Sequence, residues 1–93
     1  MNRFRSSPIK YRKRPVVIEA IKYTGTIDSA TDIFNWMADN EFYDSLYVDG
    51  KFYVKTLEGN MLVSPGNYVI CGVEKEFYSC DPYIFEKTYE AVE

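Results

Sequence analysis

The chain contains no histidine among its 93 residues. Histidine is the commonest general base and the commonest zinc ligand, so its absence excludes Ser-His and Cys-His catalytic pairs. The five glycines stand singly in turn-like segments, and none belongs to a phosphate-cradling loop. Asp39 with Glu41, or Glu74 with Glu76, are the local carboxylate pairs for a glycosidic reaction, but a solvated acidic face explains both better. We therefore expect no enzymatic activity and no cofactor.

Cysteine is scarce as well. Cys71 and Cys80 are the only two, and they are not spaced like zinc-finger ligands, so no metal site is predicted. A small secreted domain stapled by disulfides would carry more cysteines. Two reduced, partly buried thiols are therefore predicted, with a bridge between them as the alternative.

Long apolar segments are also missing. No run of eighteen apolar residues occurs, so no transmembrane helix is predicted. The basic N-terminus is not followed by the apolar stretch of a secretory signal. We therefore expect a cytoplasmic protein that does not bind a membrane.

Charge is distributed unevenly along the chain. Residues 1–14 carry six of the eleven basic residues and none of the fourteen acidic ones, although the formal net charge is only −3. Residues 1–10 lack any periodicity and include Ser-Ser-Pro, which predicts a basic mobile arm. Residues 11–93 have the length and composition of one domain with a small core.

Aromatic residues are what the chain has in excess, with nine Tyr, six Phe and one Trp. Tyrosine has an apolar ring and a polar hydroxyl, so it suits half-buried strands or a contact surface.

The first half of the chain predicts a strand followed by a helix. Pro15 disfavours helix at the residue before it, and three β-branched residues follow, so a strand is predicted over 16–23. A helix is predicted over 29–39, capped by Asp28 or Ser29 and ended by Asn40. Its apolar stripe consists of Ala30, Ile33, Phe34 and Met37.

The second half predicts an antiparallel meander of short strands. Asp49-Gly50 is typical of a two-residue hairpin turn, and Pro65-Gly66-Asn67 is typical of a type II turn. The predicted strands cover 46–48, 51–57, 61–63, 68–71 and 76–80.

The C-terminus has two possible interpretations. Asp81-Pro82 combines a helix cap with proline at the first helical position, which predicts a single turn over 83–86. Residues 87–92 then alternate as a closing strand, although a helix through Ala91 fits the same residues. Together these elements predict an α+β fold, with one helix packed on a curved, partly barrel-like antiparallel sheet of six or seven short strands.

A ligand site is predicted where the first and last strands would pair. Aromatic faces would stack on a base, and guanidinium and ammonium groups would bind phosphate. The ordinary alternative is a set of cross-strand aromatic pairs and surface charges. The predicted ligand-binding residues are Arg12, Arg14, Lys22, Tyr23, Tyr78, Lys87 and Tyr89.

Two segments of the chain, YRKRPVVIEAIKYTG and VSPGNYVICGVEKEFYSCDPYIFEKTYE, resemble a family of small accessory proteins encoded by phages and prophages. Its members begin with a Lys/Arg-Pro-Val-Val strand ending in an aromatic residue and Thr-Gly. They finish with Pro-Gly-Asp-Tyr-Ile-Ile, Gly-Glu-Phe-Tyr-Pro-Cys and Asp-Ile-Phe-Glu-Lys-Thr-Tyr. This chain departs from that pattern at Asn67, Ser79 and Tyr83, all turn or loop positions.

The resemblance implies a viral protein that acts in the cytoplasm of a bacterial host. By analogy with other small phage proteins, it implies a host-takeover or anti-defence factor that sequesters a small nucleotide-like ligand or blocks a host protein. Two alternatives remain open. One is nucleic-acid binding through residues 3–14, where Tyr11 adjoins three basic residues. The other is a structural role in which aromatic strands pair between subunits, and a dimer is the expected oligomer.

Overall fold

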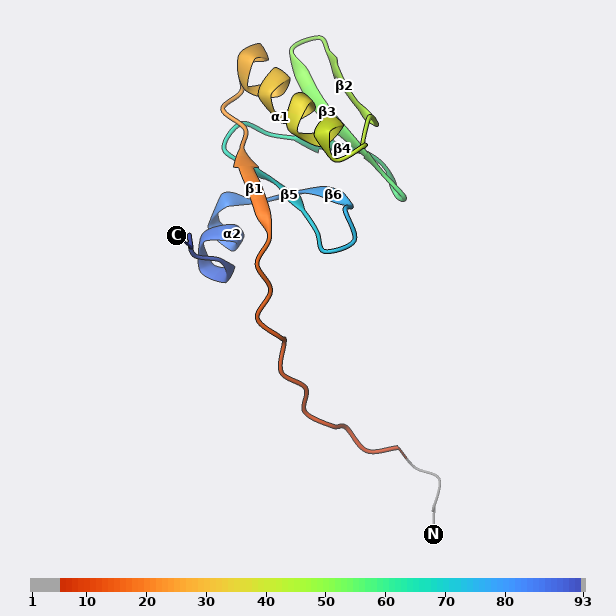
Figure 1. Cartoon of the computed structure of the whole chain (residues 1–93), viewed down its shortest axis with the longest axis vertical. Coiled ribbons are helices and arrows are strands. Elements are labelled where there is room, and N and C mark those ends of the chain that lie inside the picture. The colour runs from red at the N-terminus through yellow and green to blue at the C-terminus, as the bar shows by residue number, and fades with distance from the viewer. Residues whose placement is uncertain (1–5, 93) are drawn as a thin grey trace.

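The computed structural model of the chain describes residues 6–92, which form two helices and two three-stranded antiparallel sheets (Figure 1). The strand order is β1-β5-β6 in the first sheet and β2-β3-β4 in the second. This confirms the α+β class, but the six strands of the described chain form two separate sheets and close no barrel. The strands are β1 (Glu19–Lys22), β2 (Ser45–Val48), β3 (Lys51–Thr56), β4 (Gly59–Val63), β5 (Tyr68–Cys71) and β6 (Phe77–Cys80), and the helices are α1 (Ile27–Asp39) and α2 (Pro82–Thr88).

Helix α1 begins two residues earlier than the sequence predicts. Thr26 is its N-cap, and the Thr26 hydroxyl accepts a hydrogen bond from the Ser29 backbone N–H at 3.1 Å. Ser29 lies inside the helix, and its hydroxyl accepts from the Thr24 N–H at 3.0 Å. The predicted cap at Asp28 or Ser29 is therefore wrong, because the extended backbone that a cap needs occurs at Thr26. The predicted end at Asn40 is confirmed.

The core lies between α1 and the inner faces of the two sheets. Ala30, Ile33 and Met37 of the predicted stripe are buried, whereas Phe34 is 40% exposed. Their partners come from the residue after β1 and from four of the strands. The other members of this core cluster are Tyr23, Phe52, Val54, Val63, Val69, Cys71 and Phe77.

Both predicted turns form. Asp49 and Gly50 have φ values of 52° and 73°, as a type I′ hairpin turn requires, and Gly66 has a φ of 95°. The two cysteines are free thiols, with Cys71 buried and Cys80 half-buried. They occupy opposite ends of the β5–β6 pair, since Cys71 lies opposite Phe77. The alternative of a bridge between them is therefore wrong in this structure.

The C-terminal part corrects the sequence interpretation. Helix α2 runs from Pro82 to Thr88, and residues 89–92 form no strand. The cap prediction is confirmed, because the Asp81 carboxylate accepts from Tyr83 N–H at 2.8 Å. The helix places Phe85 on the first sheet, where its ring stacks on Tyr68 at 3.8 Å between centroids. Alternation alone did not account for this contact.

Strand β1 is shorter than predicted and has a different partner. It begins at Glu19, which lies opposite Cys71, the last residue of β5. Residues 16–18 therefore extend past the end of β5 and remain outside the sheet. The predicted pairing of the first strand with a last strand is wrong, because β1 pairs with β5.

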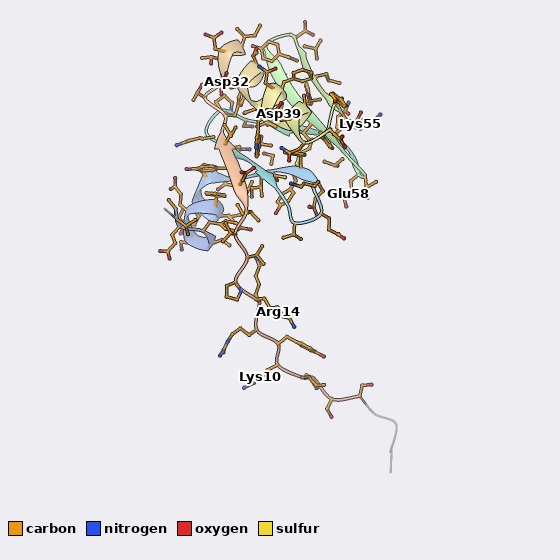
Figure 2. All side chains as sticks on the ribbon, viewed as in Figure 1. Lys10, Arg14, Asp32, Asp39, Lys55 and Glu58 are labelled. Carbon is orange, nitrogen blue, oxygen red and sulfur yellow. The ribbon has the colours of Figure 1, made fainter. Side chains whose placement is uncertain are left out.

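Residues 6–18, the leading segment, run away from the body of the protein (Figure 1). The radius of gyration is 17.0 Å, against about 12 Å expected for a compact domain of this length. Figure 2 shows Lys10 and Arg14 on this segment, whereas Asp32 and Asp39 lie on α1 at the far end of the molecule. Positive charge is thus separated in space from the acidic body.

Candidate functional site

Two grooves lie on either side of residues 16–18, and one of them carries basic and aromatic groups. This basic groove has a volume of about 640 Å³. Lys13 and Arg14 line it from the leading segment, Tyr78 from β6, and Tyr89 from the residue after α2. It therefore brings together parts of the chain that are far apart in the sequence.

The end of α2 positions Tyr89. The Tyr89 backbone N–H donates to the Phe85 carbonyl at 2.9 Å, and the two rings lie 4.9 Å apart between centroids. The Lys13 ammonium lies 5.7 Å from the centre of the Tyr89 ring, within the range of a cation–π interaction. An aromatic face and a cation thus meet at one end of the groove.

Tyr78 of β6 is half-buried and lines the same groove beside Tyr89. Burial raises the pKa of its hydroxyl above the ordinary value for tyrosine, and the neighbouring Tyr89 phenol raises it further. Tyr78 is therefore a neutral hydrogen-bonding group at physiological pH.

Three of the seven predicted ligand-binding residues line this groove: Arg14, Tyr78 and Tyr89. Lys13 joins them, although it is not one of the seven predicted residues. The run Arg12-Lys13-Arg14 marked the region, but only the fold shows which of these side chains face the groove. Arg12 is exposed on the leading segment and is not among the lining residues.

The other three predicted residues lie elsewhere. Tyr23 is 1% exposed in the core, and its ring lies 5.3 Å from that of Phe52. The Lys22 ammonium lies 5.8 Å from the Tyr68 ring, and that of Lys87 lies 4.6 Å from the Tyr83 ring. The predicted convergence of Lys22, Lys87 and Tyr23 on the site is wrong, because it assumed that β1 pairs with a C-terminal strand.

Glu76 and Glu90 also line the basic groove, so its charge is mixed. A bare phosphate would meet repulsion from these carboxylates. A ligand that carries both an anionic group and hydrogen-bond donors would use both kinds of side chain.

The second groove, here called the edge groove, follows the outer side of residues 16–21 and has a volume of about 720 Å³. Trp36 lines it from α1, and Tyr68 and Phe85 line it from the opposite face of the first sheet. Its acidic lining residues are Glu19, Glu86 and Glu90, and no lysine or arginine of the described chain lines it.

The free energy of unfolding is expected to fall as the pH becomes alkaline. Burial raises the pKa of Tyr23 and Tyr78 and of the thiols of Cys71 and Cys80. Groups whose pKa is higher in the folded state stabilise the fold below their unfolded pKa, and that contribution is lost as pH rises, here above about 9.

Urea unfolding followed by circular dichroism from pH 8 to 11 measures this loss. Tyr78→Phe should reduce the alkaline loss, whereas Tyr11→Phe, at an exposed position on the leading segment, should leave it unchanged. Equal pH profiles for wild type and Tyr78→Phe would contradict the assignment.

No family model, curated protein or solved structure matches the chain. Residues 6–92 contain no group of three potential metal-binding side chains. Neither helix of the described chain has the length and apolar character needed to cross a membrane.

Proposed function

We propose that this protein is a non-enzymatic binding protein that holds a small nucleotide-like anion in the basic groove. The observation that supports this most directly is the meeting of Lys13 and Arg14 with Tyr78 and Tyr89 in one groove. A phosphate would pair with the two cations, and a base would stack on a tyrosine ring. The carboxylates of the groove would accept hydrogen bonds from base amino groups or ribose hydroxyls.

The biological setting of the proposal comes from the sequence resemblance. A phage-encoded accessory protein that captures a nucleotide signal in the host cytoplasm would interfere with antiviral defence. Capture requires a binding site and no catalytic group, which agrees with the absence of histidine. Blocking a host protein is the alternative action in the same setting.

Binding is tested on the full chain with linear, cyclic and cyclic dinucleotides at up to millimolar concentration. A bound nucleotide should raise the melting temperature, because a ligand that binds only the folded state stabilises it by mass action. Arg14→Ala should weaken the affinity measured by calorimetry by about tenfold or more, as expected for a lost charge-assisted hydrogen bond.

Lys10→Ala is the matched control, since Lys10 is basic and exposed on the leading segment but does not line the groove. It should change the affinity by less than about twofold, because a distant exposed charge is screened by salt. If no nucleotide raises the melting temperature, or if Arg14→Ala and Lys10→Ala have equal effects, the proposed site is wrong.

Nucleic-acid binding through the leading segment is a second candidate, favoured by its projection from the acidic body (Figure 2). Tyr11 is 87% exposed and lies between Lys10 and Arg12. Arg3, Phe4 and Arg5 of the predicted nucleic-acid-binding segment lie outside the described residues. This candidate requires Lys10→Ala to weaken binding as much as Arg14→Ala, and requires affinity that falls steeply with salt.

A further inference from the structure

The outer edge of β1 has its backbone groups unpaired in the fold. In an antiparallel strand, residues alternate between pointing both backbone groups toward one neighbour and toward the other. Tyr23 points both toward the β5 side, since its N–H donates to Asn67 at 2.8 Å and its carbonyl accepts from Gly66 at 2.7 Å. The alternation therefore directs the backbone groups of Ala20 and Lys22 toward the outer edge, where no strand of the described chain pairs.

The same alternation, continued into the leading segment, directs the backbone N–H groups of Val16 and Ile18 outward. Pro15 is odd-numbered, so its backbone nitrogen points toward the β5 side, and its missing N–H removes no donor from the outer edge. The segment also exposes apolar side chains, with Val16 44% and Val17 77% exposed. Residues 16–22 therefore present a continuous, partly apolar edge to which an extended chain can add as a strand.

The edge groove runs along this free edge and has walls on both faces of the sheet. On one face, the Trp36 indole N–H donates to Glu19 at 3.2 Å. On the other face, the Tyr68 hydroxyl lies 3.4 Å from the Glu86 carboxylate, beneath α2. A strand added at the edge would bury its side chains against these two walls.

We infer that the occupant of this edge is the leading segment of a second copy of the chain, paired antiparallel to the first around a twofold axis. Charge complementarity supports this choice. The edge groove is lined by three carboxylates and no basic side chain, whereas residues 6–14 carry four basic side chains and no acidic one. The second copy would therefore bring four further cations to these carboxylates, in addition to Lys22, whose ammonium lies 5.8 Å from the Tyr68 ring.

Strand parity strengthens the match. Outward positions fall on even-numbered residues of both copies, so hydrogen-bonded pairs join even to even, and side chains of equal parity share one face. Among the even-numbered residues of 6–22, Pro8 alone has no N–H to donate in this pairing. Lys10, Arg12 and Arg14 thus lie on the face of Ala20 and Lys22, which α2 covers and where Glu86 lies. The odd-numbered Ile9 and Tyr11, 68% and 87% exposed, lie on the face of Trp36. Both charge and apolar surface are complementary in this arrangement.

The same chain cannot fill its own groove in this way, because residues 6–14 continue directly into the strand that forms the edge. In a twofold dimer, each copy pairs the outward backbone groups of the other, so neither β1 edge is left unpaired. This assembly does not depend on any ligand in the basic groove.

The test is the oligomeric state of the full chain by light scattering and sedimentation over increasing concentration. We expect a mass of twice the 10.9 kDa of one chain. Ile18→Pro removes an outward N–H and should weaken dimerisation by about tenfold or more, whereas Val17→Pro removes an inward one and should leave it within about twofold. Circular dichroism verifies that both variants are folded.

A charge swap provides an independent test. Glu86→Lys should weaken the dimer, and adding Lys10→Glu and Arg12→Glu to the same chain should restore part of the loss, because the cation introduced at position 86 then faces two carboxylates on the partner's segment. A chain that stays monomeric at all concentrations overturns the proposal and leaves the edge to a different partner. A dimer that resists both Ile18→Pro and Glu86→Lys places the interface elsewhere and overturns it as well.

Discussion

Replacement of Phe52 by alanine is expected to lower the free energy of unfolding by about 3–5 kcal/mol. Phe52 is 2% exposed on β3, and its ring lies 5.3 Å from that of Tyr23, which follows β1. The contact therefore joins the two sheets, and its loss leaves a cavity between them. A domain of this size is stable by only about 5–15 kcal/mol, so a large share of its stability would disappear.

Urea denaturation of the purified variant, followed by far-ultraviolet circular dichroism, measures this loss. Phe34→Ala is the matched control, because Phe34 is 40% exposed on α1 and lies outside the core cluster. It should cost less than about 1.5 kcal/mol, since little apolar surface is returned to water. Similar losses for the two variants would show that Phe52 does not hold the sheets together.

Replacement of Gly25 by alanine is expected to cost about 2–4 kcal/mol, because it combines backbone strain with a steric clash. Gly25 has a φ of +92°, in the region that side chains disfavour. A Cβ placed there would lie 3.0 Å from Pro65 Cγ and 3.1 Å from Pro65 Cβ. The turn before α1 and the turn before β5 would have to move apart.

Gly50→Ala separates the two causes. Gly50 has a φ of +73°, but a Cβ there would meet no atom within 4 Å, so only the strain remains. Thermal unfolding should show Gly25→Ala to be the more damaging change. Pro65→Ala should recover part of the loss in the Gly25→Ala background, which a double-mutant cycle measures. Equal costs at Gly25 and Gly50 would mean that the contact with Pro65 is unimportant.

Much of the local structure could be predicted from the sequence, because turn chemistry is local. Asp49-Gly50 correctly predicted one hairpin turn, and Asp81-Pro82 correctly predicted the start of α2. The cap of α1 was missed because Thr26 follows a glycine in a turn, where neighbouring Asp28 and Ser29 carried equally good capping groups.

The arrangement of the strands could not be predicted in the same way. Alternation shows which residues share a face of a strand, but it does not show which strands pair. The sequence therefore supported one curved sheet as well as the two sheets observed. This ambiguity also affected the candidate site. Arg14, Tyr78 and Tyr89 converge, whereas Lys22 lies on a predicted strand that has a different partner, and Lys87 lies on a helix where a strand was predicted.

The topology of the two sheets has a consequence for the order of folding. Strands β2, β3 and β4 pair with their neighbours in sequence, so this meander closes only short loops. Glu19 pairs with Cys71, and α1 and the entire second sheet lie between these two residues in the sequence. Closing that long loop costs more chain entropy before any contact compensates it. We therefore expect the β2–β4 meander to form early and β1 to pair with β5 last. The leading segment directly precedes β1, so its position relative to the rest of the protein is also set last.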